Sequence, residues 1–318
     1  PACRWRRSLS SSADAVTFDR VVKRYGTLRA VDGLSLSIRP GEMFGLIGPD
    51  GAGKTTTIRL LCGLLAADSG QVSVLGLDPA KQHAAVTRAV GYLSQRFSLY
   101  ADLSINENIA FFAEIHGLRD YRRQRDRLLD MTQLTPFRGR LADKLSGGMK
   151  QKLALACTLI HEPALIVLDE PTTGVDPVSR REFWKLLSEF LSLGLTIIMA
   201  TPYLDEAERC SRVALLHEGR LLALDTPTAL RAGMTGQLFE IIAADHRGAY
   251  DALRRMPRVA GVQMFGERAH VRVAEDDPEV EAWLAGMLQS ADVRVESIRQ
   301  VAPSLEDVFI AQLGEARP

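Results

Sequence analysis

The sequence predicts an α/β fold built on a mainly parallel sheet, followed by a small α+β domain. Two segments, 164–170 and 195–201, are continuous apolar runs of the length of buried strands. The apolar residues of 104–135 and 178–192 recur instead at helical spacing. Strands that alternate with helices are typical of a parallel sheet with helices on its faces. We therefore expect this core in the larger, N-terminal part of the chain.

The composition is that of an ordinary folded protein, and it argues against some functions. Of 318 residues, 46% are hydrophobic and 25% are charged. Lys+Arg and Asp+Glu both number 39, and this balance argues against a nucleic-acid binder that works by bulk charge. No apolar run approaches the roughly 18–20 residues of a membrane-spanning helix. The cysteines are too far apart for a metal-type pair or a disulfide framework, which fits a reducing compartment: Cys3, Cys62, Cys157 and Cys210.

Breaks in the pattern divide the chain into three expected parts. The start is rich in Arg and Ser without apolar periodicity, which predicts a linker or disordered segment. Strand-like runs begin at Val16, and a later hairpin is expected about Glu218-Gly219. Small residues and breakers gather over 226–236, and the alternating runs and two helical patterns beyond them predict an α+β domain. The expected parts are 1–14, 15–232 and 233–318.

A glycine-rich loop carries the clearest chemical signal. Residues 48–55 fit the pattern G-x-x-x-x-G-K-[ST], between a strand-like run and a helical one. Glycines let the backbone curl around phosphate oxygens, and the following helix turns its N-terminus toward the anion. Lys54 can reach the β- and γ-phosphates, and the Thr55 hydroxyl can ligate Mg²⁺. The predicted nucleotide-binding residues are Gly48, Pro49, Asp50, Gly51, Ala52, Gly53, Lys54, Thr55 and Thr56.

Two adjacent acids end the buried strand over 164–170. The ends of parallel strands line the ligand crevice of an α/β sheet. We expect Asp169 to hold Mg²⁺, directly or through water, and Glu170 to polarise the attacking water. The two can differ in role because alternate strand residues point to opposite sides. Together with Lys54, Glu170 is a predicted catalytic residue.

Residues 145–151, which read LSGGMKQ, open an apolar helix. Ser146 is a suitable N-cap, and Gly147 and Gly148 expose backbone N–H groups to a second anion. Together, the phosphate loop, the acid pair and this segment resemble the ATP-binding subunits of ABC transporters, with LSGGMKQ as their signature segment. The resemblance covers residues 16 to about 230.

The resemblance implies a P-loop NTPase of the ABC type, with a parallel-sheet core, an antiparallel β subdomain and an α-helical subdomain. It implies that Tyr25 stacks on adenine and that Gln95 contacts Mg²⁺, has a catalytic role and senses a membrane partner. It places Asp176 against an opposite subunit. The implied ligands are ATP and Mg²⁺, and the implied partners are a second ATP-binding domain and an integral membrane permease. The implied location is peripheral, at the cytoplasmic face of the inner (plasma) membrane.

One position departs from the pattern. The family normally has a histidine after the strand that follows the acids, where it contacts the γ-phosphate, and Pro202 stands at that position here. Proline has neither a side-chain donor nor a backbone N–H. None of the six histidines lies within five residues of Pro202. We therefore expect a slow ATPase site. The whole pattern resembles the first half of tandem ATP-binding subunits of ABC-2-type drug exporters.

Segment 302–309, near the end of the small domain, resembles the closing segment of drug-exporter ATPase subunits. The favoured interpretation is an ATP-hydrolysing subunit of an exporter of drugs or amphipathic small molecules. Two alternatives stay open. One is a weakly hydrolysing, ATP-dependent dimerisation module, which Pro202 motivates. The other is a soluble ABC-type ATPase of nucleic-acid maintenance or translation, which charge neutrality opposes.

Overall fold

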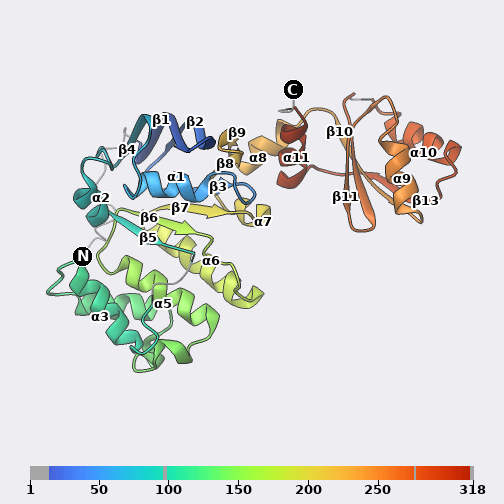
Figure 1. Cartoon of the computed structure of the whole chain (residues 1–318). Helices are drawn as coiled ribbons and strands as arrows, with labels where there is room; N and C mark the ends of the chain where they lie inside the picture. The colour runs from blue at the N-terminus through green and yellow to red at the C-terminus, as the bar shows by residue number, and fades with distance from the viewer. Residues whose placement is uncertain (1–13, 96–98, 276, 316–318) are drawn as a thin grey trace. The chain divides into compact units, whose positions relative to one another are not determined.

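The computed structural model describes residues 14–95, 99–275 and 277–315 (Figure 1). The chain divides into two compact units, 1–224 and 225–318. All but the last residue of the predicted segment 1–14 lies outside the described residues. Within the described ranges, every helix is too short or too polar to cross a membrane.

A six-stranded sheet of order β5-β6-β7-β3-β8-β9 forms the centre of the first unit. Its β3/β7, β3/β8, β5/β6 and β6/β7 pairs are parallel, as predicted. A two-residue turn with positive φ at Glu218 (47°) and Gly219 (79°) joins the last two strands and confirms the hairpin. The strands are β3 (Met43–Ile47), β5 (Val90–Leu93), β6 (Leu165–Asp169), β7 (Thr196–Thr201), β8 (Arg212–His217) and β9 (Arg220–Asp225).

A second, antiparallel sheet of order β2-β1-β4 lies on the other side of helix α1 from the central sheet (Figure 1). The helix contributes Ile58 and Leu61 to a core that also holds Val16 and Val74 from the small sheet and Phe44 from the large one. This packing fixes the start of α1 next to the carboxyl end of β3. The elements are β1 (Val16–Tyr25), β2 (Leu28–Ile38), β4 (Ser69–Val74) and α1 (Lys54–Leu61).

The helical part of the unit differs in one respect from the sequence prediction. The helical pattern over 104–135 is not continuous, because Gly117 (φ 67°) ends the first helix in a left-handed turn. Ser104 begins that helix with a capping box to Glu107. The helices of the unit, other than α1, are α2 (His83–Ala89), α3 (Ile105–Ile115), α4 (Arg122–Met131), α5 (Gly147–Leu159), α6 (Pro177–Ser192) and α7 (Leu204–Ala207), with short 3₁₀ turns η2 (Thr135–Phe137) and η3 (Ala142–Lys144).

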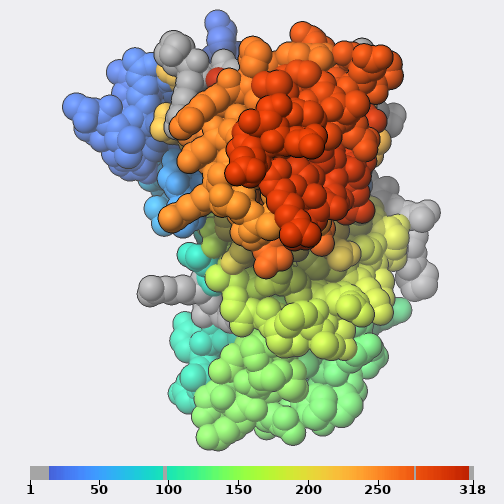
Figure 2. Space-filling model, turned by 90° about the vertical axis from the view of Figure 1, so that its right-hand side faces the viewer, coloured from blue at the N-terminus to red at the C-terminus, as the bar shows by residue number. Residues whose placement is uncertain are grey.

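The second unit is an α+β domain with an antiparallel sheet of order β11-β12-β10-β13. Helices α9 and α10 cover one face through residues such as Leu253 and Leu284, and Figure 2 views the unit from their side. Strand β11 was not predicted, and beyond residue 236 two helices were predicted where the described residues form three. The elements are α8 (Pro227–Ala232), β10 (Gln237–Ala243), α9 (His246–Leu253), β11 (Val259–Phe265), β12 (Arg268–Val273), α10 (Val280–Ser290), β13 (Val295–Gln300) and α11 (Leu305–Glu315).

Candidate nucleotide-binding site

The glycine-rich loop joins the end of β3 to the first residue of α1, as predicted. A Cβ on Gly48 would lie 2.2 Å from the carbonyl oxygen of Leu216, and one on Gly53 would lie 2.4 Å from that of Ala30. Gly53 is also the N-cap of α1, with φ 97°. The neighbouring backbone therefore requires glycine at both positions, apart from any ligand.

Lys54 turns back over this loop. Only 5% of the residue is exposed, and its Nζ donates to the carbonyl oxygens of Gly48 at 2.7 Å and Pro49 at 3.0 Å. Burial lowers the pKa of Lys54, whereas nearby carboxylates, above all Glu170, oppose that shift. A phosphate beside the ammonium group would likewise favour its charged form.

Asp169 ends β6 beside the loop and is 4% exposed. Its carboxylate accepts hydrogen bonds from the Thr55 hydroxyl and from the Tyr92 hydroxyl, the latter at 3.4 Å. Its Oδ1 is buried without a hydrogen-bond partner among the described residues. Burial raises the pKa of Asp169, and the charge of Glu170 adds to that shift. An orphaned carboxylate oxygen next to a threonine hydroxyl is a donor set that fits Mg²⁺.

Glu170 follows in a left-handed conformation, with φ 48°. Its N–H donates to the carbonyl oxygen of Ala200 at 2.9 Å, which extends the β6/β7 pairing by one residue. Its Oε2 accepts from Gln95 Nε2 at 2.8 Å and from the Thr173 hydroxyl at 3.4 Å. The structure thus brings Gln95 to Glu170, and the metal contact expected of Gln95 stays a prediction. Such strained backbone is common where a side chain must be aimed at a ligand.

The segment over 145–151 places its two glycines differently. Ser146 caps α5 by accepting from the Met149 N–H at 3.3 Å. Gly147 is exposed, and a Cβ there would meet no described atom within 4 Å. Gly148 is buried, and a Cβ there would lie 2.3 Å from the Oγ of Ser179 in α6. Gly148 therefore has a packing role that the sequence did not reveal.

Comparisons with known proteins identify the family of this chain. A family model described as "ABC transporter" matches residues 31–173. The Nod factor export ATP-binding protein I of Paraburkholderia xenovorans is 39% identical over 305 residues, which are 94% of this chain and 97% of that protein. The chain belongs to the ATP-binding proteins of ABC transporters.

Other relatives extend the similarity to the second unit. Residues 226–313 match the C-terminal domain of the "ATP-binding protein DrrA1-3-like" family. A "Probable multidrug ABC transporter ATP-binding protein", YbhF of Escherichia coli, is 41% identical over 309 residues. These residues are 95% of this chain but only 52% of YbhF, so the chain spans about half the length of that relative.

A solved structure confirms the predicted ABC-type P-loop fold. It is cbiO1 from Clostridium perfringens, part of the ABC transporter complex cbiONQ. It aligns with a TM-score of 0.65 and 26% identity, covering 77% of this chain and 96% of cbiO1.

Two residues that the ABC resemblance singled out lie near the surface. Tyr25 ends β1 and is 47% exposed, so its ring is available for stacking. Asp176 is the N-cap of α6 and accepts from the N–H groups of Val178 at 3.1 Å and Ser179 at 2.9 Å. The side-chain and backbone hydrogen bonds from Ser179 are the main reason that the pKa of Asp176 is lowered. The roles expected of both residues toward ATP and an opposite subunit stay predictions.

Pro202 directly follows β7, as the register of the sequence predicted. It is half-buried, and the next N–H, that of Tyr203, donates to the Thr201 hydroxyl at 3.1 Å. Two buried polar residues beside the site, Gln151 and Glu206, were not predicted from the sequence. Gln151 lies within the signature segment itself, so its position was the available signal.

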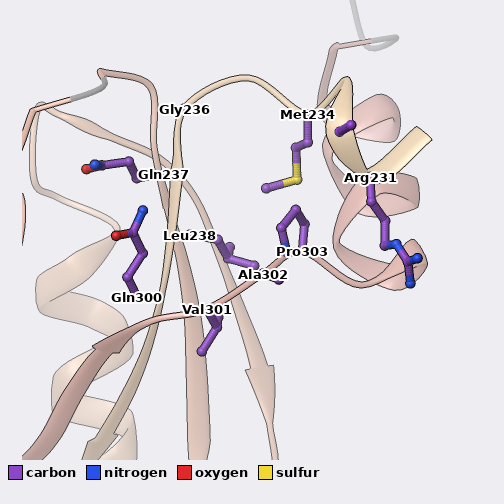
Figure 3. Close-up of a pocket in the computed structure, with 10 residues that line it drawn as sticks. Arg231, Met234, Gly236, Gln237, Leu238, Gln300, Val301, Ala302 and Pro303 are labelled. Atoms are coloured by element: carbon purple, nitrogen blue, oxygen red, sulfur yellow. The ribbon is translucent and has the colours of Figure 1, made fainter. Parts of the chain in front are cut away.

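The second unit has a pocket of about 460 Å³, which Figure 3 shows. None of the predicted site residues lines it. It lies between the end of α8, the start of β10 and the chain that follows β13, and it includes the start of the segment 302–309. Its lining residues are Arg231, Ala232, Met234, Gly236, Gln237, Leu238, Gln300, Val301, Ala302 and Pro303.

Proposed function

We propose that this chain binds and hydrolyses ATP and thereby powers an ABC-type membrane exporter of drugs or amphipathic small molecules. One observation carries the proposal: the phosphate loop, the orphaned Asp169 oxygen and the Glu170 carboxylate lie together at the carboxyl edge of one parallel sheet. The multidrug description of YbhF supports the cargo class.

Each side chain has a distinct task in this proposal. Lys54 and the N-terminus of α1 neutralise the phosphate charge that grows during hydrolysis. Thr55 and Asp169 would hold Mg²⁺, which would supply further positive charge to the phosphate oxygens. Glu170 orients and polarises the attacking water. Gln95 steadies the Glu170 carboxylate through its 2.8 Å hydrogen bond and contributes a ligand oxygen to the metal.

The site is completed by a second ATP-binding domain, identical or homologous. The signature segment of that domain faces the phosphate loop of this chain, and this chain offers its own Ser146 and Gly147 in return. Both residues are exposed, as a contact to another subunit requires. The chain acts from the cytoplasmic face of the inner membrane, attached to an integral permease, and no nucleic acid takes part.

The phosphate loop of this chain forms a nucleotide site, and Pro202 makes hydrolysis at that site slow. Loss of one transition-state donor typically lowers kcat by about 10²–10³-fold. We expect turnover well below 1 s⁻¹, which is the lower end of common enzyme rates. A module that binds ATP to dimerise, with little hydrolysis, is the second candidate function, and Pro202 is the observation that favours it.

Stopped-flow phosphate release from the full chain tests the proposal. We expect Pro202→His to raise the rate at least tenfold, whereas Pro202→Ala, which restores the backbone N–H but adds no side-chain donor, leaves it unchanged. Lys54→Ala should abolish both ATP binding and hydrolysis. Wild-type turnover of about 1 s⁻¹ or faster, or no gain in Pro202→His, contradicts the slow site. Binding of ATP with equal affinity by Lys54→Ala contradicts the whole proposal.

A further inference from the structure

A carboxyl group that the proposed reaction does not use lies buried beside the site. Glu206 belongs to the short helix α7 and is 1% exposed. Its Oε1 accepts a hydrogen bond from the Thr172 hydroxyl, and the side chain of Thr201 lies close enough to oppose the effect of burial on the pKa of Glu206. Its Oε2 has no hydrogen-bond partner among the described residues. Burial raises the pKa of Glu206. A buried carboxyl group is costly unless it is hydrogen-bonded, so the position of Glu206 between two threonines calls for an explanation.

The two threonines belong to the two segments that frame the reacting phosphate in the proposed mechanism. Thr201 is the last residue of β7 and directly precedes Pro202. Thr172 lies two residues after Glu170, within the segment 171–173. Glu206 therefore links the end of β7 to the chain that follows the catalytic carboxylate.

Segment 171–173 controls the position of Glu170. The Thr173 N–H donates to the carbonyl oxygen of Glu170 at 3.3 Å, and its hydroxyl contacts Oε2 at 3.4 Å. Because Glu170 is held at a positive φ, its neighbours must fix it firmly. A displaced Thr172 would displace Thr173 and, with it, the carboxylate.

The same segment is held from a second direction. Gln151 of α5 is fully buried, and its Nε2 donates to the carbonyl oxygen of Pro171. Segment 171–173 therefore lies between two buried polar side chains, one from the signature helix and one from α7. The Glu206 side connects it to β7 and the Pro202 position.

We propose that Glu206 is a positioning residue for ATP hydrolysis, which anchors segment 171–173 to the end of β7 and thereby aims Glu170. The inference rests on the proposed function, since it presupposes that Glu170 acts on ATP. In this proposal Glu206 makes no contact with the nucleotide.

The test is steady-state hydrolysis and ATP binding by the full chain with Glu206→Ala and Thr172→Val. A misplacement of about 1 Å can cost about 10²-fold in rate, so we expect kcat to fall about 10- to 100-fold in either variant. KM and ATP affinity should stay within about twofold, because the phosphate loop is not touched. Thr172→Ser, which keeps the hydroxyl, should retain the wild-type rate. The double variant should be no slower than the slower single variant, because both remove one linkage.

Asp205→Ala is the matched control, because Asp205 is an exposed acid on the same helix. It should leave kcat unchanged. Thr172→Val changes no buried charge and carries the test if Glu206→Ala does not fold. An unchanged kcat in Thr172→Val, a parallel loss of ATP affinity, or additive effects in the double variant overturns the inference. Lys54→Ala gives the background: a wild-type rate no higher than this background refutes the proposed function and this inference with it. If the wild-type rate exceeds this background and Thr172→Val has the same rate as the wild type, this inference alone is refuted.

Discussion

Replacing Gly148 with alanine should destabilise the first unit, whereas the same change at Gly147 should not. The added Cβ at position 148 would lie 2.3 Å from the Oγ and 2.5 Å from the Cβ of Ser179. A rotation of the serine side chain relieves only the first contact, because the Cβ is fixed to the backbone of α6. The two helices must therefore move apart by about an ångström to restore ordinary contact. At Gly147, the Cβ meets no described atom within 4 Å.

The size of the effect follows from two opposing contributions. Overpacking a filled site costs about 1–3 kcal/mol. Alanine in place of glycine in a helix recovers about 0.5–1 kcal/mol. We expect Gly148→Ala to lose about 1–2 kcal/mol, which is a fall of about 2–8 °C in Tm for a unit of this size. Gly147→Ala should keep the wild-type Tm or exceed it slightly.

Differential scanning calorimetry of the single variants and of Gly148→Ala/Ser179→Gly measures this. Ser179→Gly removes both close atoms and leaves the Cα of residue 179 at 3.7 Å, so the double variant should lose less than the sum of the two singles. The reasoning is refuted if Gly148→Ala melts with the wild type. It is refuted equally if alanine at 148 costs as much with glycine at 179 as with serine.

Two further predictions concern buried titratable groups in the same unit. Burial, followed by the charge of His116, lowers the pKa of His161 to about 4, and the two rings stack at 3.8 Å. The unfolded chain therefore binds a proton near pH 6.5 that the folded chain refuses until about pH 4, so stability should fall by about 2–3 kcal/mol as the pH drops through this window. Urea unfolding should show a shallower pH dependence in His161→Gln, and equal slopes would contradict the account. Burial raises the pKa of Cys62 and Cys210 to about 12, and that of Cys157 as well. These thiols should react with iodoacetamide at pH 8 about 10³-fold more slowly than in urea, and mass spectrometry of the peptides would expose any faster labelling.

The sequence alone determined the parts of the site that depend on neighbours along the chain. The pattern G-x-x-x-x-G-K-[ST] between a strand and a helix is a spacing along the chain, so the register of Lys54 and Thr55 could be read directly. The acids at the end of a buried strand and the serine cap of α5 are local features of the same kind. The departure at Pro202 was visible because the flanking residues fixed its register.

Only the tertiary structure decided which distant residues share an environment. Gln95 contacts Glu170 across 75 positions of sequence, and Thr172 contacts Glu206 across 34. The sequence did not separate the two signature glycines either, because the reason for Gly148 is a serine on another helix. The apolar pattern also predicted one helix through the turn at Gly117, and β11 was not predicted. These outcomes depend on how elements pack against each other, and apolar periodicity reports which face of an element is buried but not which side chain it meets.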